Sequence, residues 1–185
     1  MKNNITPPSF FSVKGFLSVQ IGLYILLASY LIKSSLDGYV LEGFAGNELS
    51  TEQISLFIQL LVILTFLFSG LTLFFFGNHR ARRSKQSLWD NRTKSEALKF
   101  LISFLVVFAV LYMLYTKNLN EYLGPVFLIG FGIHHILQTP ISKEKLLIPA
   151  LCLLLTIICI IIPSYWYPSL LILAMAYITY GVAVK

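Results

Sequence analysis

The chain has 185 residues, of which 57% are hydrophobic and only 12% are charged, and its formal net charge is +6. Soluble domains carry about 25% charged residues, so this composition excludes an ordinary water-soluble domain and predicts an integral membrane protein. In such a protein a positive net charge first reports orientation across the bilayer. No module that reads bases accompanies the charge, so we expect no nucleic-acid partner.

Six apolar stretches follow one another along the chain, and none of them contains Asp, Glu, Lys or Arg. Their lengths suit membrane helices and exceed the 9 to 11 residues that a barrel strand needs. Lipid offers no partner to a free backbone group, so stretches of this kind must be helical. We therefore predict one all-α membrane domain, 1–185, whose transmembrane helices lie at about 16–32, 54–76, 100–116, 122–138, 147–162 and 168–184.

Prolines lie at the ends of these stretches. Pro125, Pro149 and Pro168 fall in the first turns of the last three stretches, where a missing N–H costs nothing. No proline falls in the middle of a stretch. The broken helices that secondary transporters use as binding sites are therefore not indicated.

Basic residues are distributed unequally between the two sides of the predicted membrane. Twelve of the 14 Lys and Arg residues fall on the side of the two termini, and only Lys33 and Lys117 fall on the other. The positive-inside rule places the twelve in the cytoplasm. We predict a multi-pass protein of the inner (plasma) membrane, of bacterial type, with both termini inside, a basic cytoplasmic loop at 77–99 and an acidic outer loop at 33–53.

The six stretches group into three hairpins. Each hairpin begins with a lysine at the inner face, at Lys14, Lys99 and Lys145, and the first two share the pattern K-x-(F/L)-x-S. From each of these lysines to the outer turn is 18 or 19 residues. This spacing predicts a threefold helical-hairpin repeat, a feature that fixes architecture when it is present.

This layout resembles the HdeD-type acid-resistance membrane proteins. The resemblance covers the whole chain in arrangement, and its motifs are SGLTLFFFGNHRAR at 69–82 and LIGFGIHHILQTP at 128–140, where a small residue within the helix is followed by a polar or basic stop. The family is richer in glycine in its outward helices than this chain is. The resemblance implies a protective role in the inner membrane and carries over no catalytic residue.

Two adjacent histidines, His134 and His135, lie within the fourth stretch. An ionisable group inside a membrane helix is by default a functional hypothesis, so a site for a polar ligand or a proton is one interpretation. Hydrogen bonding between helices is the other. A haem held by two histidines needs ligands on opposite faces of its ring and a metal ion needs further ligands, so we expect no metal and no cofactor.

A basic run follows the second stretch and includes Arg80, Arg82, Arg83 and Lys85. Such a cluster just inside a membrane helix is typical of contact with anionic lipid headgroups. A docking surface for a soluble partner is the alternative that the sequence leaves open.

No constellation in the sequence provides acid–base groups in mutual reach, as enzymatic proton transfer needs. We therefore predict a non-enzymatic small membrane protein with a role in envelope stress or in support of a partner. The alternative is a transporter or pore subunit for a small neutral or weakly acidic solute, using His134 and His135. Beyond the bilayer itself, the expected partner is a second copy of the chain or another membrane protein, because little soluble mass shields the helix faces.

Overall fold

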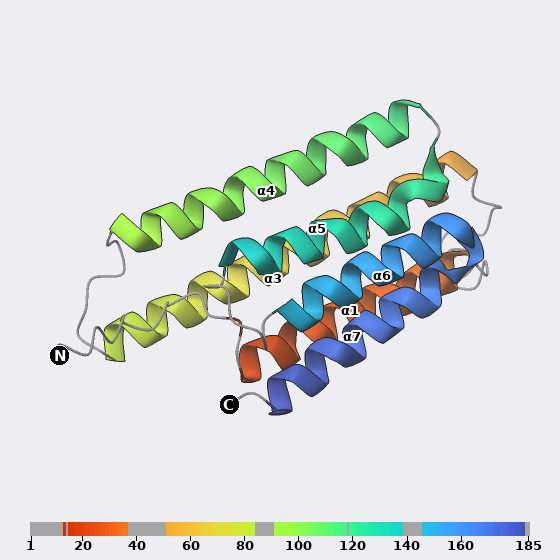
Figure 1. Cartoon of the computed structure of the whole chain (residues 1–185). Coiled ribbons are helices and arrows are strands. Elements are labelled where there is room, and N and C mark those ends of the chain that lie inside the picture. Colours follow the sequence, from red (N-terminus) through yellow and green to blue (C-terminus); the bar gives the residue numbers. More distant parts are fainter. Residues whose placement is uncertain are drawn as a thin grey trace.

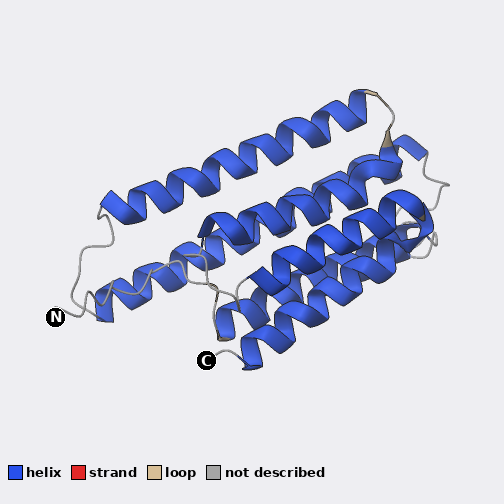
Figure 2. Cartoon of the chain, viewed as in Figure 1, coloured by secondary structure: helices blue, strands red, loops and turns tan. Residues whose placement is uncertain are grey.

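The computed structural model describes residues 13, 15–36, 51–83, 91–117, 119–138 and 146–183. Every regular element in these ranges is a helix, and none of them is a strand. The predicted all-α class is therefore confirmed. Figure 2 shows these helices as a single bundle of rods connected by short turns and undescribed segments.

The helices lie side by side, and the ribbon reverses direction from each long helix to the next (Figure 1). In chain order they are α1 (Phe16–Leu36), α3 (Thr51–Arg83), α4 (Asn91–Thr116), the 3-10 turn η1 (Asn120–Tyr122), α5 (Leu123–Gln138), α6 (Leu147–Ile161), the 3-10 turn η3 (Pro163–Tyr165) and α7 (Trp166–Ala183).

Four segments are long and apolar enough to cross a membrane: Phe16–Ser35, Glu52–Arg83, Ala97–Thr116 and Pro163–Ala183. Helices α5 and α6 are apolar but shorter. With 16 and 15 residues they reach about 24 and 22 Å, against a hydrocarbon core of about 30 Å. Length and composition thus support four of the six predicted spans, and the crossing of α5 and α6 stays a prediction.

The predicted loop at 77–99 needs correction, because most of it is helical. Helix α3 continues through 77–83 and α4 begins at Asn91, which leaves only 84–90 between them outside the described residues. The physical reason is that hydropathy reports where lipid ends and not where helical hydrogen bonding ends. Alanine and arginine are good helix formers, and cations in a last turn favour the helix dipole.

Other boundaries move by a few residues. Helix α1 ends at Leu36 and α3 begins at Thr51, so the predicted outer loop at 33–53 is helical at both ends, and its middle, 37–50, lies outside the described residues. The segment 139–145 also lies outside the described residues.

Helix α5 is the central element of the bundle, with α4, α6, α3 and α7 as neighbours. Its position between α4 and α6 is visible in Figure 1. The most extensive helix contact, however, joins α1 to α7, and the next joins α5 to α6. Both exceed the contacts inside the predicted hairpins, so packing between hairpins contributes more to this bundle than packing within them.

The contact between α1 and α7 is close because glycines line it. A Cβ on Gly22 would lie 2.8 Å from the carbonyl oxygen of Ala174, and a Cβ on Gly181 would lie 2.6 Å from that of Gly15. The hydroxyl of Ser18 donates to the carbonyl oxygen of Tyr177 across the same contact, at 2.7 Å. Small residues and hydroxyls of this kind are what membrane helices use to approach one another.

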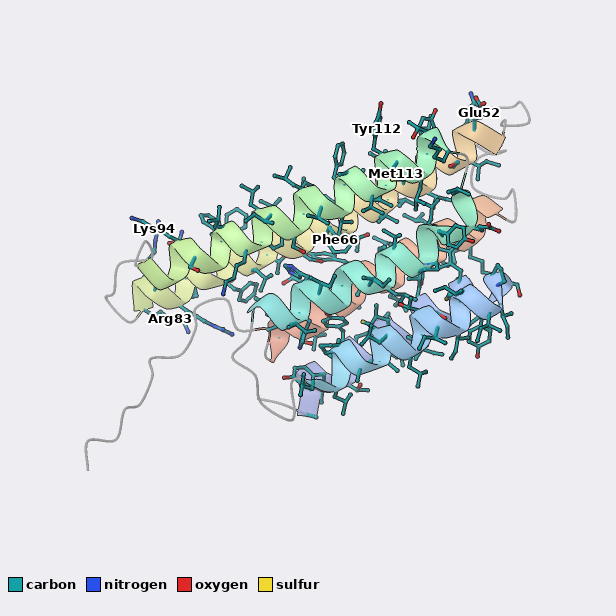
Figure 3. All side chains as sticks on the ribbon, turned by 45° about the horizontal axis from the view of Figure 1, so that its top comes forward. Glu52, Phe66, Arg83, Lys94, Tyr112 and Met113 are labelled. Carbon is teal, nitrogen blue, oxygen red and sulfur yellow. The ribbon has the colours of Figure 1, made fainter. Side chains whose placement is uncertain are left out.

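The outside of the bundle is apolar, as a lipid-facing surface should be. Helix α4 shows this most clearly: only 17% of its apolar window is buried, against 39–44% in the other three long segments. Figure 3 shows the side chain of Tyr112 pointing away from the other helices. Large apolar side chains on this face are exposed, among them Leu101, Leu105, Phe108 and Met113.

We expect Gly22→Ala to destabilise the protein, because the added methyl group would meet backbone atoms of α7 that cannot rotate away. Overpacking of this kind costs about 1–3 kcal/mol. Thermal unfolding in detergent, followed by circular dichroism, measures the loss. The control is Ala109→Val, which adds more volume at an exposed position of α4. Equal melting temperatures for the two variants would contradict a close contact between α1 and α7.

Candidate functional site

The two histidines lie on the last turns of α5, and both are buried, with 3% of His134 and 1% of His135 exposed. Neighbouring residues on a helix point about 100° apart. The two rings consequently contact different helices. The side chains that surround the two rings differ in kind.

His134 lies in an aromatic environment made by α3 and α4. The ring of Phe100 meets it edge-on, with centroids 4.7 Å apart, and Phe66 lies at 6.5 Å in a similar orientation. Phe100 itself packs over Gly70 of α3, where a Cβ would overlap its ring. His134 therefore sits where α3, α4 and α5 meet, covered by Phe100.

His135 faces α7. The hydroxyl of Tyr177 lies 3.5 Å from Nδ1 of His135, which is the long limit of a hydrogen bond. The rings of Tyr177 and Tyr180 meet that of His135 at centroid distances of 5.8 and 6.0 Å, both nearly perpendicular. The carbonyl oxygen of Tyr177 also accepts a hydrogen bond from the hydroxyl of Ser18. Tyr177 therefore connects α7 to both α1 and α5.

The arrangement gives each histidine its own aromatic partners and does not direct both toward one point. No group of three or more His, Cys, Asp and Glu side chains that could hold a metal ion occurs among the described residues. In this geometry the two imidazole rings lie between helices, where side chains of α3, α4 and α7 contact them.

The basic cluster lies at the end of α3. Arg82 and Arg83 are exposed and Arg80 is half-buried, while Lys85 lies outside the described residues. The first turns of α4 add two exposed cations, Lys94 and Lys99. Figure 3 shows Arg83 and Lys94 at the same end of the molecule, opposite Glu52 at the start of α3.

Lys94 and Lys99 were missed as site residues at the level of sequence. Their contribution to charge was evident there, but the position of Lys94 at the same end of the molecule as Arg83 was not. The signal that would have found them is the good helix-forming composition of 91–99, which continues α4 toward the basic end of α3.

A third polar group joins α1 and α3 within the apolar region. The side-chain amide of Gln20 donates to the hydroxyl of Tyr24 at 2.8 Å, and that hydroxyl lies 3.1 Å from the hydroxyl of Thr72. Gln20 and Thr72 stand out in the sequence as polar residues in apolar stretches. The spacing of four between Gln20 and Tyr24, one helical turn, was the available sign that they act together.

Comparisons with known proteins add no family or homologue to these observations. A scan against protein-family models finds no matching family, and searches of the curated proteins and of the solved structures find no match.

Phe100→Ala should uncover His134, because it removes the ring that meets the imidazole edge-on. We expect diethyl pyrocarbonate to modify His134 several-fold faster in this variant than in the wild type, as measured by peptide mass spectrometry. His135 serves as the control within the same chain, since its aromatic partners come from α7. Equal acceleration at both histidines would instead indicate general loosening of the bundle.

Proposed function

We propose that all six helices cross the inner membrane of a bacterial cell as three hairpins, with both termini in the cytoplasm. The alternating direction of the helices (Figure 1) and the basic residues at one end support this topology. Helices α5 and α6 are short for a free span, but they lie against neighbouring helices, and a bilayer adapts to a short span at modest cost by thinning.

Within this membrane setting, we propose a non-enzymatic protein that supports a partner complex or the tolerance of the envelope to stress. The observation that carries this proposal is the exposed basic surface at the inner end, Arg82, Arg83, Lys94 and Lys99. The last turn of α3 and the first turns of α4 present it. Cations at this end of the helices attract anionic lipid headgroups or an acidic partner surface.

The geometry of the histidines favours this function over transport. A shared proton or solute site would need the two imidazoles to face one path, whereas they contact different helices through aromatic rings. A protective role in the envelope is also what the resemblance to the HdeD-type proteins would imply, and we include it on that basis only.

Lipid is the proposed neighbour of the exposed face of α4. Helices that pair in membranes do so through small residues, whereas the exposed side chains of α4 are mostly large, such as Leu101, Val106, Phe108 and Tyr112. A partner or a second copy is therefore expected to bind at the basic end of the molecule and not along α4.

Changing Arg82 and Arg83 together to Gln should weaken binding of phosphatidylglycerol about 30-fold, because each cation near an anionic surface contributes about 1 kcal/mol. Titration of the purified protein with this lipid, followed by native mass spectrometry, measures the effect. Arg80 is left unchanged because it is half-buried.

The matched control is Lys117→Gln, which removes an exposed cation at the other end of α4. It should leave binding unchanged, and the melting temperatures of all three proteins should agree. Equal loss in the control and in the double variant would remove the basic end as the basis of the proposed function.

The alternative, transport through the histidine pair, has its own test. We expect vesicles that contain the wild-type protein to take up glycerol and acetic acid no faster than empty vesicles. Uptake above that level that is lost when His134 and His135 are both changed to Phe would favour the transporter over the proposed role.

A further inference from the structure

Helix α6 is short and exposes a broad apolar face. Five of its large apolar side chains are more than half exposed: Leu153, Leu154, Ile157, Ile160 and Ile161. The helix has 15 residues between Leu147 and Ile161, so it is about 22 Å long. The hydrocarbon core of a typical bilayer is about 30 Å thick, and α6 is therefore shorter than such a core by about 8 Å.

Charged residues fix the inner boundary of this helix. Lys143, Glu144 and Lys145 directly precede Leu146 in the sequence, and a charge deep in hydrocarbon is strongly unfavourable. A long lysine side chain can reach an interface from within the membrane, whereas the shorter side chain of Glu144 has less reach. The hydrocarbon region therefore cannot extend far beyond the first turn of α6 on this side.

Backbone carbonyl groups fix the outer boundary, because the last carbonyls of a helix have no partner within it. The N–H of Ile162 donates to the carbonyl oxygen of Ile158 at 2.8 Å, and no backbone N–H of the described residues donates to the carbonyl oxygens of Ile160 and Ile161. Pro163, which follows, has no N–H. Since lipid tails cannot pair with these carbonyls, water or headgroups must reach the last turn of α6.

Helix α3 has a longer lipid-facing surface than α6. Its exposed large apolar side chains run from Leu56 to Phe75, a rise of about 28 Å. The helix begins at Thr51 and ends at Arg83, so both of its ends lie outside that stretch. Helix α3 packs mainly against α1 and α4, and α6 packs mainly against α5 and α7. The two helices therefore meet lipid on different parts of the bundle, and the apolar surface is shorter on α6.

We propose that the exposed face of α6 binds phospholipids with short acyl chains, so that the bilayer beside α6 is thinner than the bilayer beside α3. A short apolar surface thins the bilayer around it, and each ångström of mismatch is unfavourable. Lipids with short chains form a thinner bilayer and so match α6 with less mismatch. The five exposed side chains of this face are Leu or Ile, and we therefore expect selection by chain length and not by headgroup.

This inference rests on the proposed topology, in which α6 crosses the membrane, and adds the kind of lipid that α6 selects. It uses none of the residues at the basic end. Binding of anionic lipid at Arg82 and Arg83 can therefore persist when a preference for short chains at α6 is absent, and the reverse, so that the two failures are distinguishable.

The test adds one tryptophan in the middle of each surface, as Leu154→Trp on α6 and as the matched control Leu67→Trp on α3. Both leucines are exposed. The full-length protein is reconstituted in brominated dioleoylphosphatidylcholine, which quenches tryptophan fluorescence on contact, and the wild type supplies the background from Trp89 and Trp166. Unbrominated phosphatidylcholines with shorter or longer chains then compete. The recovery of fluorescence measures how strongly each lipid binds beside the added tryptophan.

We expect dimyristoleoylphosphatidylcholine to compete about threefold better than dierucoylphosphatidylcholine at Leu154→Trp, and by a smaller ratio at Leu67→Trp, because a thick bilayer mismatches α6 more than α3. Leu153→Trp, at another exposed position, is a second reporter on α6 in case the first variant fails to fold. Equal ratios on the two helices would overturn the proposal and leave the topology standing. Quenching at Leu67→Trp without quenching at either α6 reporter would place α6 outside the bilayer and overturn both.

Discussion

The bundle depends on how closely the neighbouring helices approach α5, and two glycines of α5 set that distance. A Cβ on Gly130 would lie 2.7 Å from the ring of Phe66, and one on Gly132 would lie 3.1 Å from Cβ of Cys152. Lipid tails are as apolar as leucine, so membrane helices gain little from burying apolar surface and associate through close packing. The smooth faces around these glycines let Phe66 and α6 fit against the central helix, where Phe127 and Phe131 complete a fully buried aromatic cluster.

The same solvent governs the polar side chains. With no water in the hydrocarbon region, each must find a partner inside the protein. Most hydroxyls do so on their own helix, which is a local solution and links nothing. A smaller group of polar contacts connects helices: Ser18 with Tyr177, Tyr24 with Thr72, Cys159 with Ser169, and His135 with Tyr177. These contacts join α1 to α7, α1 to α3, α6 to α7 and α5 to α7, so the polar residues of the bundle specify which helices are neighbours, while its glycines specify how near they come.

Sequence reasoning identified the all-α class and the long apolar segments, because the absence of charge over about 20 residues has one physical meaning. It placed the end of α3 at 76 and the start of α4 at 100, which is where the predicted apolar stretches end, whereas the helices continue to Arg83 and from Asn91. The pairing of α1 with α7 was beyond it, because continuous apolar stretches carry no period that tells one face from another, and neither Phe100 nor Tyr177 is near the histidines in the chain.

An ionisable group in a membrane helix attracts attention because an unpaired polar group there is costly. The cost arises because the polar group lacks a hydrogen-bond partner, and not because the group can ionise. His134 and His135 are buried among aromatic and hydroxyl groups that the fold supplies. At Gln20 the fold leaves a buried carbonyl oxygen that accepts no hydrogen bond from the described residues, so a neutral residue in the bundle can carry this cost as well as an ionisable one.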